Sequence, residues 1–325
     1  MRSGSGAGFR WMICVAMLVG ATAALAQNYP TRPIKVVVGF GPGGVADVTA
    51  RVVGQKLGAI LGQTVVVENK PTAGGIVAAE SVAKAQPDGY TLLLMTNGNA
   101  VSASLFKSLP YDIGKDFAPV STLGFFDVAI VSGRNSGIDS VAAMLAWAKA
   151  HPGKLNIGTI NVGSTQNLSA ELFKSMTGLN ATIVPFKGSP AVIEALARGD
   201  VQVGFEMLAP IMPQAKSGNV KILAVAAGQR YPGLPDVPTV AQAGVPGYAA
   251  TSWNAIAAPA RTPAAVIERL NQAINQALAA PDVREKLALQ GVVARGSSPA
   301  QMGKLVNDDT EKWRKVIEGA KIERQ

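Results

Sequence analysis

Residues 34–53 have the sequence IKVVVGFGPGGVADVTARVV, which is the clearest indication of the fold class. Its first five residues are mostly β-branched and apolar, which is typical of a strand covered on both faces. A glycine-rich run, residues 39–44, interrupts this strand. Apolar residues then recur at helical spacing, at Val48, Val52, Leu57 and Leu61. The stretch therefore predicts a strand, a glycine loop and a helix, in that order.

The same alternation continues along the chain. Further buried strands are predicted at residues 64–68, 90–95, 155–159, 182–185, 201–205 and 221–225. A second polar glycine loop, residues 161–165, precedes a helix with an apolar face. The proline-rich residues 231–246 predict a connection between domains, and helices at 266–278 and 300–317 are expected to pack back on the first sheet. This order predicts two α/β lobes with mostly parallel, doubly wound sheets, between which the chain crosses at least twice.

The composition excludes several classes of site. The 325 residues include one histidine, His151, and one cysteine, Cys14, so the usual zinc sites, a disulfide within the chain and a thiol–imidazole pair are excluded. The formal net charge is +9. Lys and Arg are scattered and form no stripe interleaved with aromatics, so no nucleic-acid partner is expected.

The N-terminal residues 1–26 have the pattern of a secretory signal peptide. Arg2 and Arg10 precede a short apolar run, and small residues at 24–26 suit a cleavage site near Ala26. Cys14 lies inside the apolar run, where it does not match a lipoprotein signal. The mature protein is therefore expected to be exported and free of cysteine.

The first glycine loop has two possible uses. Residues 39–44 fit G-x-G-x-x-G, and Glu68 ends the next strand, as in a Rossmann-type NAD enzyme. Pro42 removes an amide from that loop, and an exported chain is an unusual place for NAD. The alternative is an anion site, because amides at a helix start stabilise a carboxylate or phosphate. The second loop offers the same amides and two hydroxyls, so the two helix starts would hold one anion from two lobes, unless both loops are only tight turns.

The sequence also resembles the Bug family, the periplasmic solute-binding receptors of tripartite tricarboxylate transporters. The resemblance covers residues 28–322 and rests on a series of short motifs. They are YPTRPI (29–34), GPGGVAD (41–47), VENKP (67–71), AGG (73–75), PDGYT (87–91), VPFKG (184–188), LPDVPT (234–239), AGVPGY (243–248) and APARTP (258–263).

The resemblance implies a type II periplasmic-binding-protein fold with a ligand cleft between its lobes. Lobe 1 would comprise residues 27–128 and 248–325, and lobe 2 residues 129–247. The implied function is capture of a small organic carboxylate by hinge closure, without a cofactor, metal or catalysis. Delivery to the membrane permease of a tripartite transporter by a periplasmic monomer is expected, with a sensor protein as the alternative partner. Dicarboxylates, tricarboxylates, aromatic acids, acidic amino acids and nicotinate-like acids all suit such a site.

The resemblance also assigns candidate ligand-binding residues. The first-lobe jaw would be Phe40, Pro42, Gly43, Gly44 and Asp47, and the second-lobe jaw Ser164, Thr165 and Asn167. Asp47 is interpreted as a partner of loop amides or a water anchor, and Asn167 stands where the family often has histidine.

Further candidates come from strand ends, which face the ligand crevice in α/β sheets. They are Thr96 and Asn97, Lys187 and Gly188, and Glu206. Lys187 would attract an anion or be solvated, and Glu206 would select an ammonium group or face solvent. Trp253 and Tyr248 would line the cleft or pack in the core.

Overall fold

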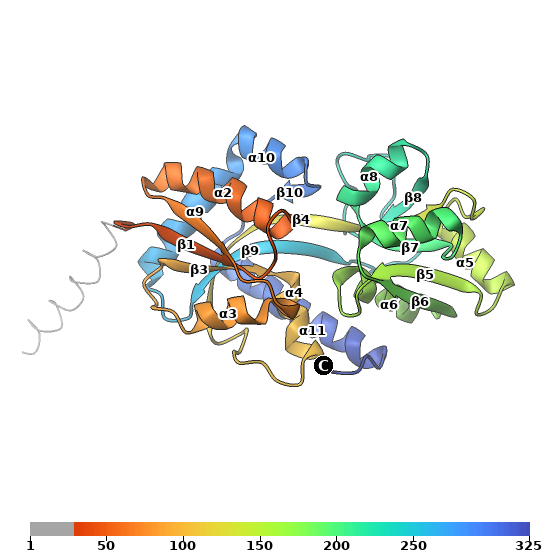
Figure 1. Ribbon diagram of the computed structural model, residues 1–325, viewed down its shortest axis with the longest axis horizontal. Helices are drawn as coiled ribbons and strands as arrows, with labels where there is room; N and C mark the ends of the chain where they lie inside the picture. Colours follow the sequence, from red (N-terminus) through yellow and green to blue (C-terminus); the bar gives the residue numbers. More distant parts are fainter. Residues whose placement is uncertain (1–28) are drawn as a thin grey trace, which may run out of the picture.

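The computed structural model describes residues 29–325, so the predicted signal peptide lies outside the described residues. Two lobes lie side by side and are joined by long strands that run between them (Figure 1). Within residues 29–325, no helix combines the length and the apolar character that a membrane span requires.

The first lobe has a sheet in the order β2-β1-β3-β9-β4, with β10 paired to β4. Strands β1 (Ile34–Val38), β2 (Val65–Asn69) and β3 (Thr91–Thr96) are parallel. Strands β9 (Thr251–Pro259) and β10 (Val292–Ala294) pair antiparallel with their neighbours. The helices of this half are α2 (Val45–Leu61), the short η1 (Ala73–Gly75), α3 (Ile76–Ala83), α4 (Asn97–Leu105), α9 (Ala264–Ala279) and α10 (Pro281–Ala288).

The second lobe repeats this arrangement on a smaller scale. Strands β5 (Leu155–Ile160), β6 (Ala181–Phe186) and β7 (Val203–Met207) are parallel, and β8 (Val220–Val225) pairs antiparallel with β4. Its helices are α5 (Val141–Ala150), α6 (Thr165–Thr177), α7 (Ser189–Arg198) and α8 (Leu208–Lys216). The two-lobe α/β fold predicted from the sequence is thus the observed fold.

Strand β4 (Phe117–Gly133) belongs to both sheets and links the lobes. Its residues 117–127 pair with β9, and its residues 128–133 pair with β7 and β8. No strand was predicted at the residues of β4 or β9, and the antiparallel pairing of these two strands makes the sheets mixed. Pro119 and Gly124 interrupt the apolar pattern of β4, and the register with β9 shifts at both places. Such a strand therefore lacks a clean period in its sequence.

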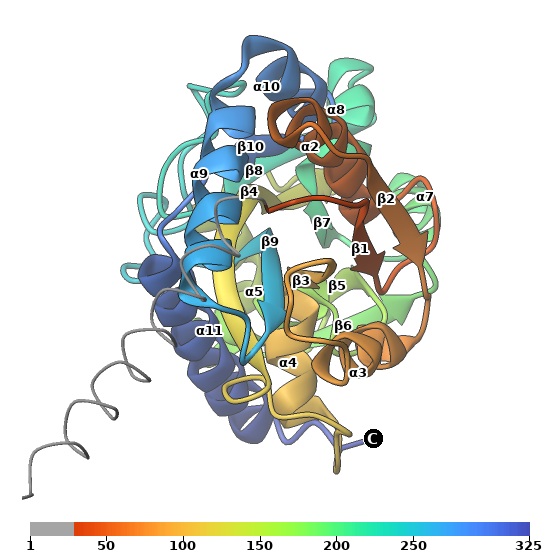
Figure 2. The ribbon, with the colours of Figure 1, turned by 90° about the vertical axis from the view of Figure 1, so that its left-hand side faces the viewer.

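The C-terminal helix α11 (Pro299–Gly319) packs on both lobes, which corrects the prediction that the last helices all return to the first sheet. Helices α9 and α10 do belong to a core cluster of the first lobe. In α11, Met302 and Val306 belong to a core cluster of first-lobe residues. Trp313, Val316 and Ile317 of the same helix belong to the main core cluster of the second lobe. Figure 2 shows α9 and α11 along one side of the molecule.

Candidate functional site

The two glycine loops have the same local geometry. Gly43 and Gly163 have φ angles of 83° and 80°, which favour glycine because it has no Cβ. Each is followed by the N-cap residue of a long helix, Gly44 before α2 and Ser164 before α6. The Gly43 amide donates to Asp47 Oδ2 at 2.9 Å, and the Gly163 amide donates to Asn167 Oδ1 at 3.2 Å. In each loop, the side-chain oxygen of the residue four positions after the glycine therefore accepts the glycine amide and fixes the turn.

Asp47 is a buried structural acceptor, in line with its interpretation as a partner of loop amides. Only 2% of the residue is exposed. It also accepts hydrogen bonds from Asn69 Nδ2 at 2.8 Å and from Arg51 Nε at 3.0 Å. Burial acts to raise its pKa, but the hydrogen bonds from Arg51, Gly43 and Asn69 outweigh it and hold the pKa below its ordinary value. Asp47 is therefore a carboxylate committed to the loop.

Asn167 has the corresponding role in the second lobe. It is 3% exposed, and its Nδ2 donates to Thr159 Oγ1 at 3.3 Å. Its backbone amide donates to Ser164 Oγ at 3.1 Å, which caps α6. A carboxamide is sufficient at this position, because the Gly163 amide needs an acceptor and Thr159 Oγ1 needs a donor.

A cavity of about 290 Å³ lies between the two helix starts. It is lined by residues of both lobes and of the strands that join them. These are Phe40, Gly44, Val45, Ala46, Thr96, Gly98, Phe126, Ile160, Gly163, Ser164, Thr165, Gln166, Met207, Ser252 and Asn254. Five of the candidate residues are thus brought together at one cavity: Phe40, Gly44, Thr96, Ser164 and Thr165.

The other eight candidates do not line this cavity. Gly43, Asp47 and Asn167 shape the loops, and Pro42 is exposed at the first of them. Lys187 is exposed, and Gly188 is the N-cap of α7. Asn97 and Glu206 are buried next to cavity residues.

Asn97 connects the lobes beneath the cavity. It accepts a hydrogen bond from Thr165 Oγ1 at 3.0 Å, and its Nδ2 donates to Asp309 Oδ2 at 2.8 Å. The same Asp309 oxygen accepts from Trp253 Nε1 at 2.6 Å. We call Thr165, Asn97, Asp309 and Trp253 the interlobe network. Trp253 is thereby a core residue, as is Tyr248, whose hydroxyl donates to the Ser169 carbonyl at 2.8 Å.

Glu206 has no exposed surface, which excludes the alternative that it faces solvent. It lies inside β7 and not beyond the strand end. Its Oε2 accepts from Ser189 Oγ at 2.7 Å and from the Met207 amide at 3.1 Å. Burial raises the pKa of the Glu206 carboxyl above its ordinary value, and these hydrogen bonds offset only part of that effect.

Of the six lining residues that lie on strands, only Thr96 was predicted from the sequence; the five that were missed are Phe126, Ile160, Met207, Ser252 and Asn254. Ser252 and Asn254 lie two residues apart on β9 and so share one face of the sheet, and Phe126 lies on β4. Asn254 is fully buried, and neither polar atom of its carboxamide has a hydrogen-bond partner. A polar pair at spacing two inside the apolar run 251–259 was the available signal.

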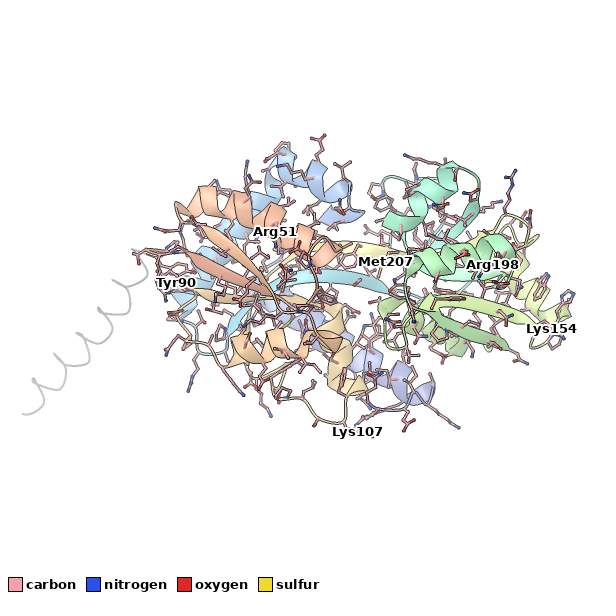
Figure 3. All side chains as sticks on the ribbon, viewed as in Figure 1. Arg51, Tyr90, Lys107, Lys154, Arg198 and Met207 are labelled. Carbon is pink, nitrogen blue, oxygen red and sulfur yellow. The ribbon has the colours of Figure 1, made fainter. Side chains whose placement is uncertain are left out.

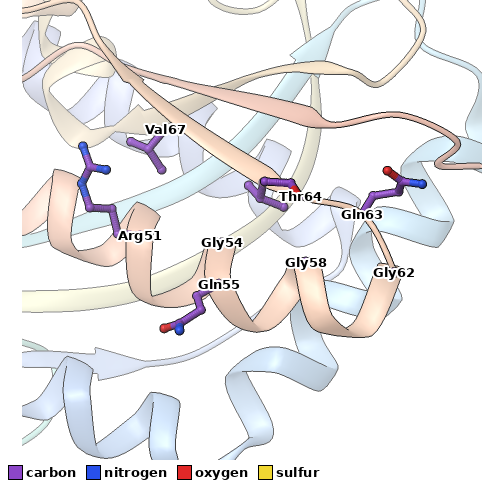
Figure 4. A pocket seen from close by; sticks show the side chains of 9 residues that line it. Arg51, Gly54, Gln55, Gly58, Gly62, Gln63, Thr64 and Val67 are labelled. Carbon is purple, nitrogen blue, oxygen red and sulfur yellow. The ribbon is translucent and has the colours of Figure 1, made fainter.

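A wider groove, of about 690 Å³, lies elsewhere, between α2 and the edge strand β2. Figure 4 shows Gly54 and Gly58 on the side of α2 that faces this strand, and Gly62 just after the end of the helix. A Cβ at Gly54 would meet Val65 at 3.1 Å, and one at Gly58 would meet the Gln63 carbonyl at 2.9 Å. These two glycines therefore allow close packing of helix on strand.

In residues 29–325 there is also no cluster of three metal-ligating side chains.

Comparison with known proteins gives a consistent result over nearly the whole chain. A family model described as "Tripartite tricarboxylate transporter family receptor" matches residues 49–322. Protein BugT of Bordetella pertussis (strain Tohama I) is 38% identical over 307 residues, which cover 93% of this chain and 94% of that protein.

Two solved structures are similar in both sequence and fold. "R. palustris Rpa4515 with adipate" has a TM-score of 0.77 at 35% identity, and the match covers 90% of this chain and 98% of that one. "MatC (Rpa3494) from Rhodopseudomonas palustris with bound malate" has a TM-score of 0.73 at 32% identity, with coverage of 89% and 100%. The similarity therefore extends over both lobes and the strands between them.

Proposed function

Because the chain belongs to the tripartite tricarboxylate transporter receptor family, we propose that it captures a small organic carboxylate in the cavity between α2 and α6 and delivers it to a membrane permease. This family consists of solute-binding receptors, not enzymes, so the Rossmann-type reading of the first glycine loop is wrong. The protein is a solute-binding receptor of the type II periplasmic-binding-protein fold.

The observation that carries the proposal is the meeting of two helix starts at one cavity. The first turn of an α-helix has amides without an intrahelical acceptor, and the helix dipole favours an anion there. Val45 and Ala46 begin α2, Thr165 and Gln166 begin α6, and all four line the cavity. The ligand carboxylate would accept hydrogen bonds from amides of both lobes.

The two hydroxyls of the second loop are not equivalent as donors. Thr165 Oγ1 already donates to Asn97, so its proton is committed to the interlobe network. Ser164 Oγ accepts from the Asn167 amide and retains its own proton. Ser164 is therefore the proposed side-chain donor to the carboxylate. Phe40, Gly44 and Thr96 are proposed to contact the ligand, and Pro42, Gly43, Asp47 and Asn167 to shape the loops.

Two solved relatives support an acid as ligand, one with adipate and one with bound malate. We further propose export to the periplasm after cleavage near Ala26, since receptors of this family are periplasmic. Lobe closure about β4 and β9 would follow ligand binding only as far as the ligand bonds both lobes.

Thermal unfolding of the mature protein against a panel of carboxylates and uncharged sugars tests the proposal. A ligand at 100 times its Kd should add about 2.7 kcal/mol to the free energy of unfolding. Stabilisation by one or more carboxylates, with none from sugars, is the expected result. Tight binding of a sugar with no response to any acid would refute the proposal.

A further inference from the structure

The cavity between the two helix starts has an apolar body. Its large side chains are Phe40 and Val45 from the first lobe, Phe126 from the linking strand β4, and Ile160 and Met207 from the second lobe. Figure 3 labels Met207 near the middle of the molecule, on the side of the second lobe that is turned toward the first. Apolar walls on both lobes favour a ligand whose body is itself apolar.

No lysine, arginine, histidine, aspartate or glutamate is among the residues that line the cavity. Three acidic residues adjoin the lining along the chain: Asp47 follows Ala46, Asp127 follows Phe126, and the buried Glu206 precedes Met207. Lys187, the basic candidate from the sequence, is exposed and outside the lining. A second carboxylate inside the cavity would thus lose hydration without meeting a cation. The negative charge of the ligand is therefore confined to the helix starts.

Asn254 shows that the cavity is built for one more polar group. Its carboxamide is fully buried, and both its nitrogen and its oxygen are without hydrogen-bond partners. A buried amide in this state is unfavourable unless a ligand or water completes its hydrogen bonds. Because Asn254 offers both a donor and an acceptor, a hydroxyl group can satisfy it with no additional charge.

We propose that the preferred ligands are aromatic monocarboxylates with a neutral hydrogen-bonding substituent, such as a ring hydroxyl. The carboxylate lies at the starts of α2 and α6, the ring contacts Phe40, Phe126 and Met207, and the substituent pairs with Asn254. The volume of about 290 Å³ equals the share of about ten water molecules, enough for one substituted ring acid. This inference rests on the proposed function and names the ligand class for the same site.

Calorimetric titration of the mature protein with four acids tests the ligand class. The probes are 4-hydroxybenzoate, benzoate, succinate and citrate. We expect 4-hydroxybenzoate to bind at least about tenfold more tightly than succinate or citrate, because only the latter two bring extra charge into apolar walls. Its hydroxyl should improve the affinity over benzoate about threefold to tenfold.

A variant separates the role of Asn254 from general packing. In Asn254→Leu, the advantage of 4-hydroxybenzoate over benzoate should disappear. Asn135→Leu is the matched control, because Asn135 is exposed in the loop after β4 and should keep the advantage. Thermal unfolding without ligand checks that both variants fold, and the wild-type titrations test the ligand class independently of either variant.

The outcomes distinguish the two proposals. Tighter binding of succinate or citrate than of both ring acids overturns the ligand class and leaves carboxylate capture standing. A persistent hydroxyl advantage in folded Asn254→Leu overturns the role of Asn254. Failure of every acid to bind, with a sugar bound instead, overturns carboxylate capture itself.

Discussion

At the residue scale, the two loops show how one turn geometry is fixed by two different side chains. Asp47 and Asn167 both accept the amide of a glycine with positive φ four residues earlier. Only Asp47 has a cation beside it, because Arg51 follows one turn later on α2. The charge on Asp47 is therefore neutralised locally and does not repel an anion at the helix start.

Replacement of Asp47 by alanine should destabilise the protein by about 1–3 kcal/mol, because the Gly43 amide and Asn69 lose a buried acceptor. Asp47→Asn should lose less, since its carbonyl can still accept the Gly43 amide as Asn167 does for Gly163. Urea denaturation measures both. Glu194→Ala, which removes only an exposed ion pair with Arg198, is the control and should change little. Equal losses in Asp47→Ala and Glu194→Ala would contradict this role.

Asp127 gives a prediction for the pH dependence of stability. It is 7% exposed on β4, at the last position paired with β9, and burial raises its pKa to about 6. Nearby Arg295 and Thr251 offset only part of this effect. A carboxyl with a folded pKa above its unfolded value of about 4 binds more protons when folded, so stability should fall as pH rises between about 4 and 6.

Asp127→Asn should therefore be more stable than the wild type at pH 8, by about 1–3 kcal/mol, and about equal to it at pH 3.5. Chemical denaturation at the two pH values measures the difference. If the variant gained nothing at pH 8, the carboxylate would be well accommodated at the junction of the lobes.

At the element scale, α2 and α6 begin in different ways. Gly44 provides no side-chain cap for α2, whereas Ser164 Oγ caps α6 by accepting the Asn167 amide. Ser164→Ala should cost about 1 kcal/mol of stability through the lost cap. It should also weaken carboxylate binding about tenfold, because it removes the one free hydroxyl donor of that loop. Calorimetry and urea denaturation measure the two effects separately. Ser140→Ala, which removes the equivalent cap of α5, is the matched control and should affect stability alone.

The interlobe network ties α4, α6, β9 and α11 together through one carboxylate. Asp309→Ala would leave both Asn97 and Trp253 without an acceptor, so we expect a loss of about 2–4 kcal/mol. Asp309→Asn keeps one acceptor oxygen and should lose less. The exposed Asp308, one residue earlier, provides the control variant Asp308→Ala. Near-ultraviolet circular dichroism should report the changed surroundings of Trp253 in Asp309→Ala alone.

At the scale of the whole molecule, the lobes share their cores. The main cluster of the second lobe contains Val101 and Leu105 from α4 together with Trp313, Val316 and Ile317 from α11. The chain end also pairs with α4, since the Gln325 amide donates to the Leu105 carbonyl at 2.9 Å. The proposed division at residues 128/129 and 247/248 therefore describes the sheets better than it describes the helices, and it stays a prediction.

Residues 129–247 expressed alone should not unfold cooperatively, because eight core residues of this cluster would be missing: Val101, Leu105, Val128, Tyr248, Ala250, Trp313, Val316 and Ile317. Full-length protein should show one transition in urea that coincides in fluorescence and circular dichroism. Truncation after residue 310 should likewise expose the second-lobe core and weaken that transition. A cooperative transition in the isolated fragment would show that the second lobe folds without α4 and α11.

The sequence alone determined the features that depend on near neighbours in the chain. The strand–loop–helix units, both helix starts and the two-lobe α/β fold follow from local periodicity and from glycine positions such as Gly43 and Gly163. The motif series indicated the family, and five candidates meet at the cavity. Hydrophobic period and turn chemistry act over a few residues, so they are visible in one sequence.

The side chains that complete the cavity could not be predicted from the sequence, because long-range packing brings them together. Phe126 and Asn254 lie on long antiparallel strands whose pairing joins distant residues and whose bulges break the pattern. Asn97 was predicted to face the ligand cleft, but it is part of the interlobe network. Its partner Asp309 is 212 positions away in the chain, so this hydrogen bond could not be predicted from the sequence. Glu206 is fully buried, so it adjoins the lining residue Met207 but does not itself line the cavity. Contacts of this kind depend on how lobes and helices pack in space, and no local period in the sequence encodes that packing.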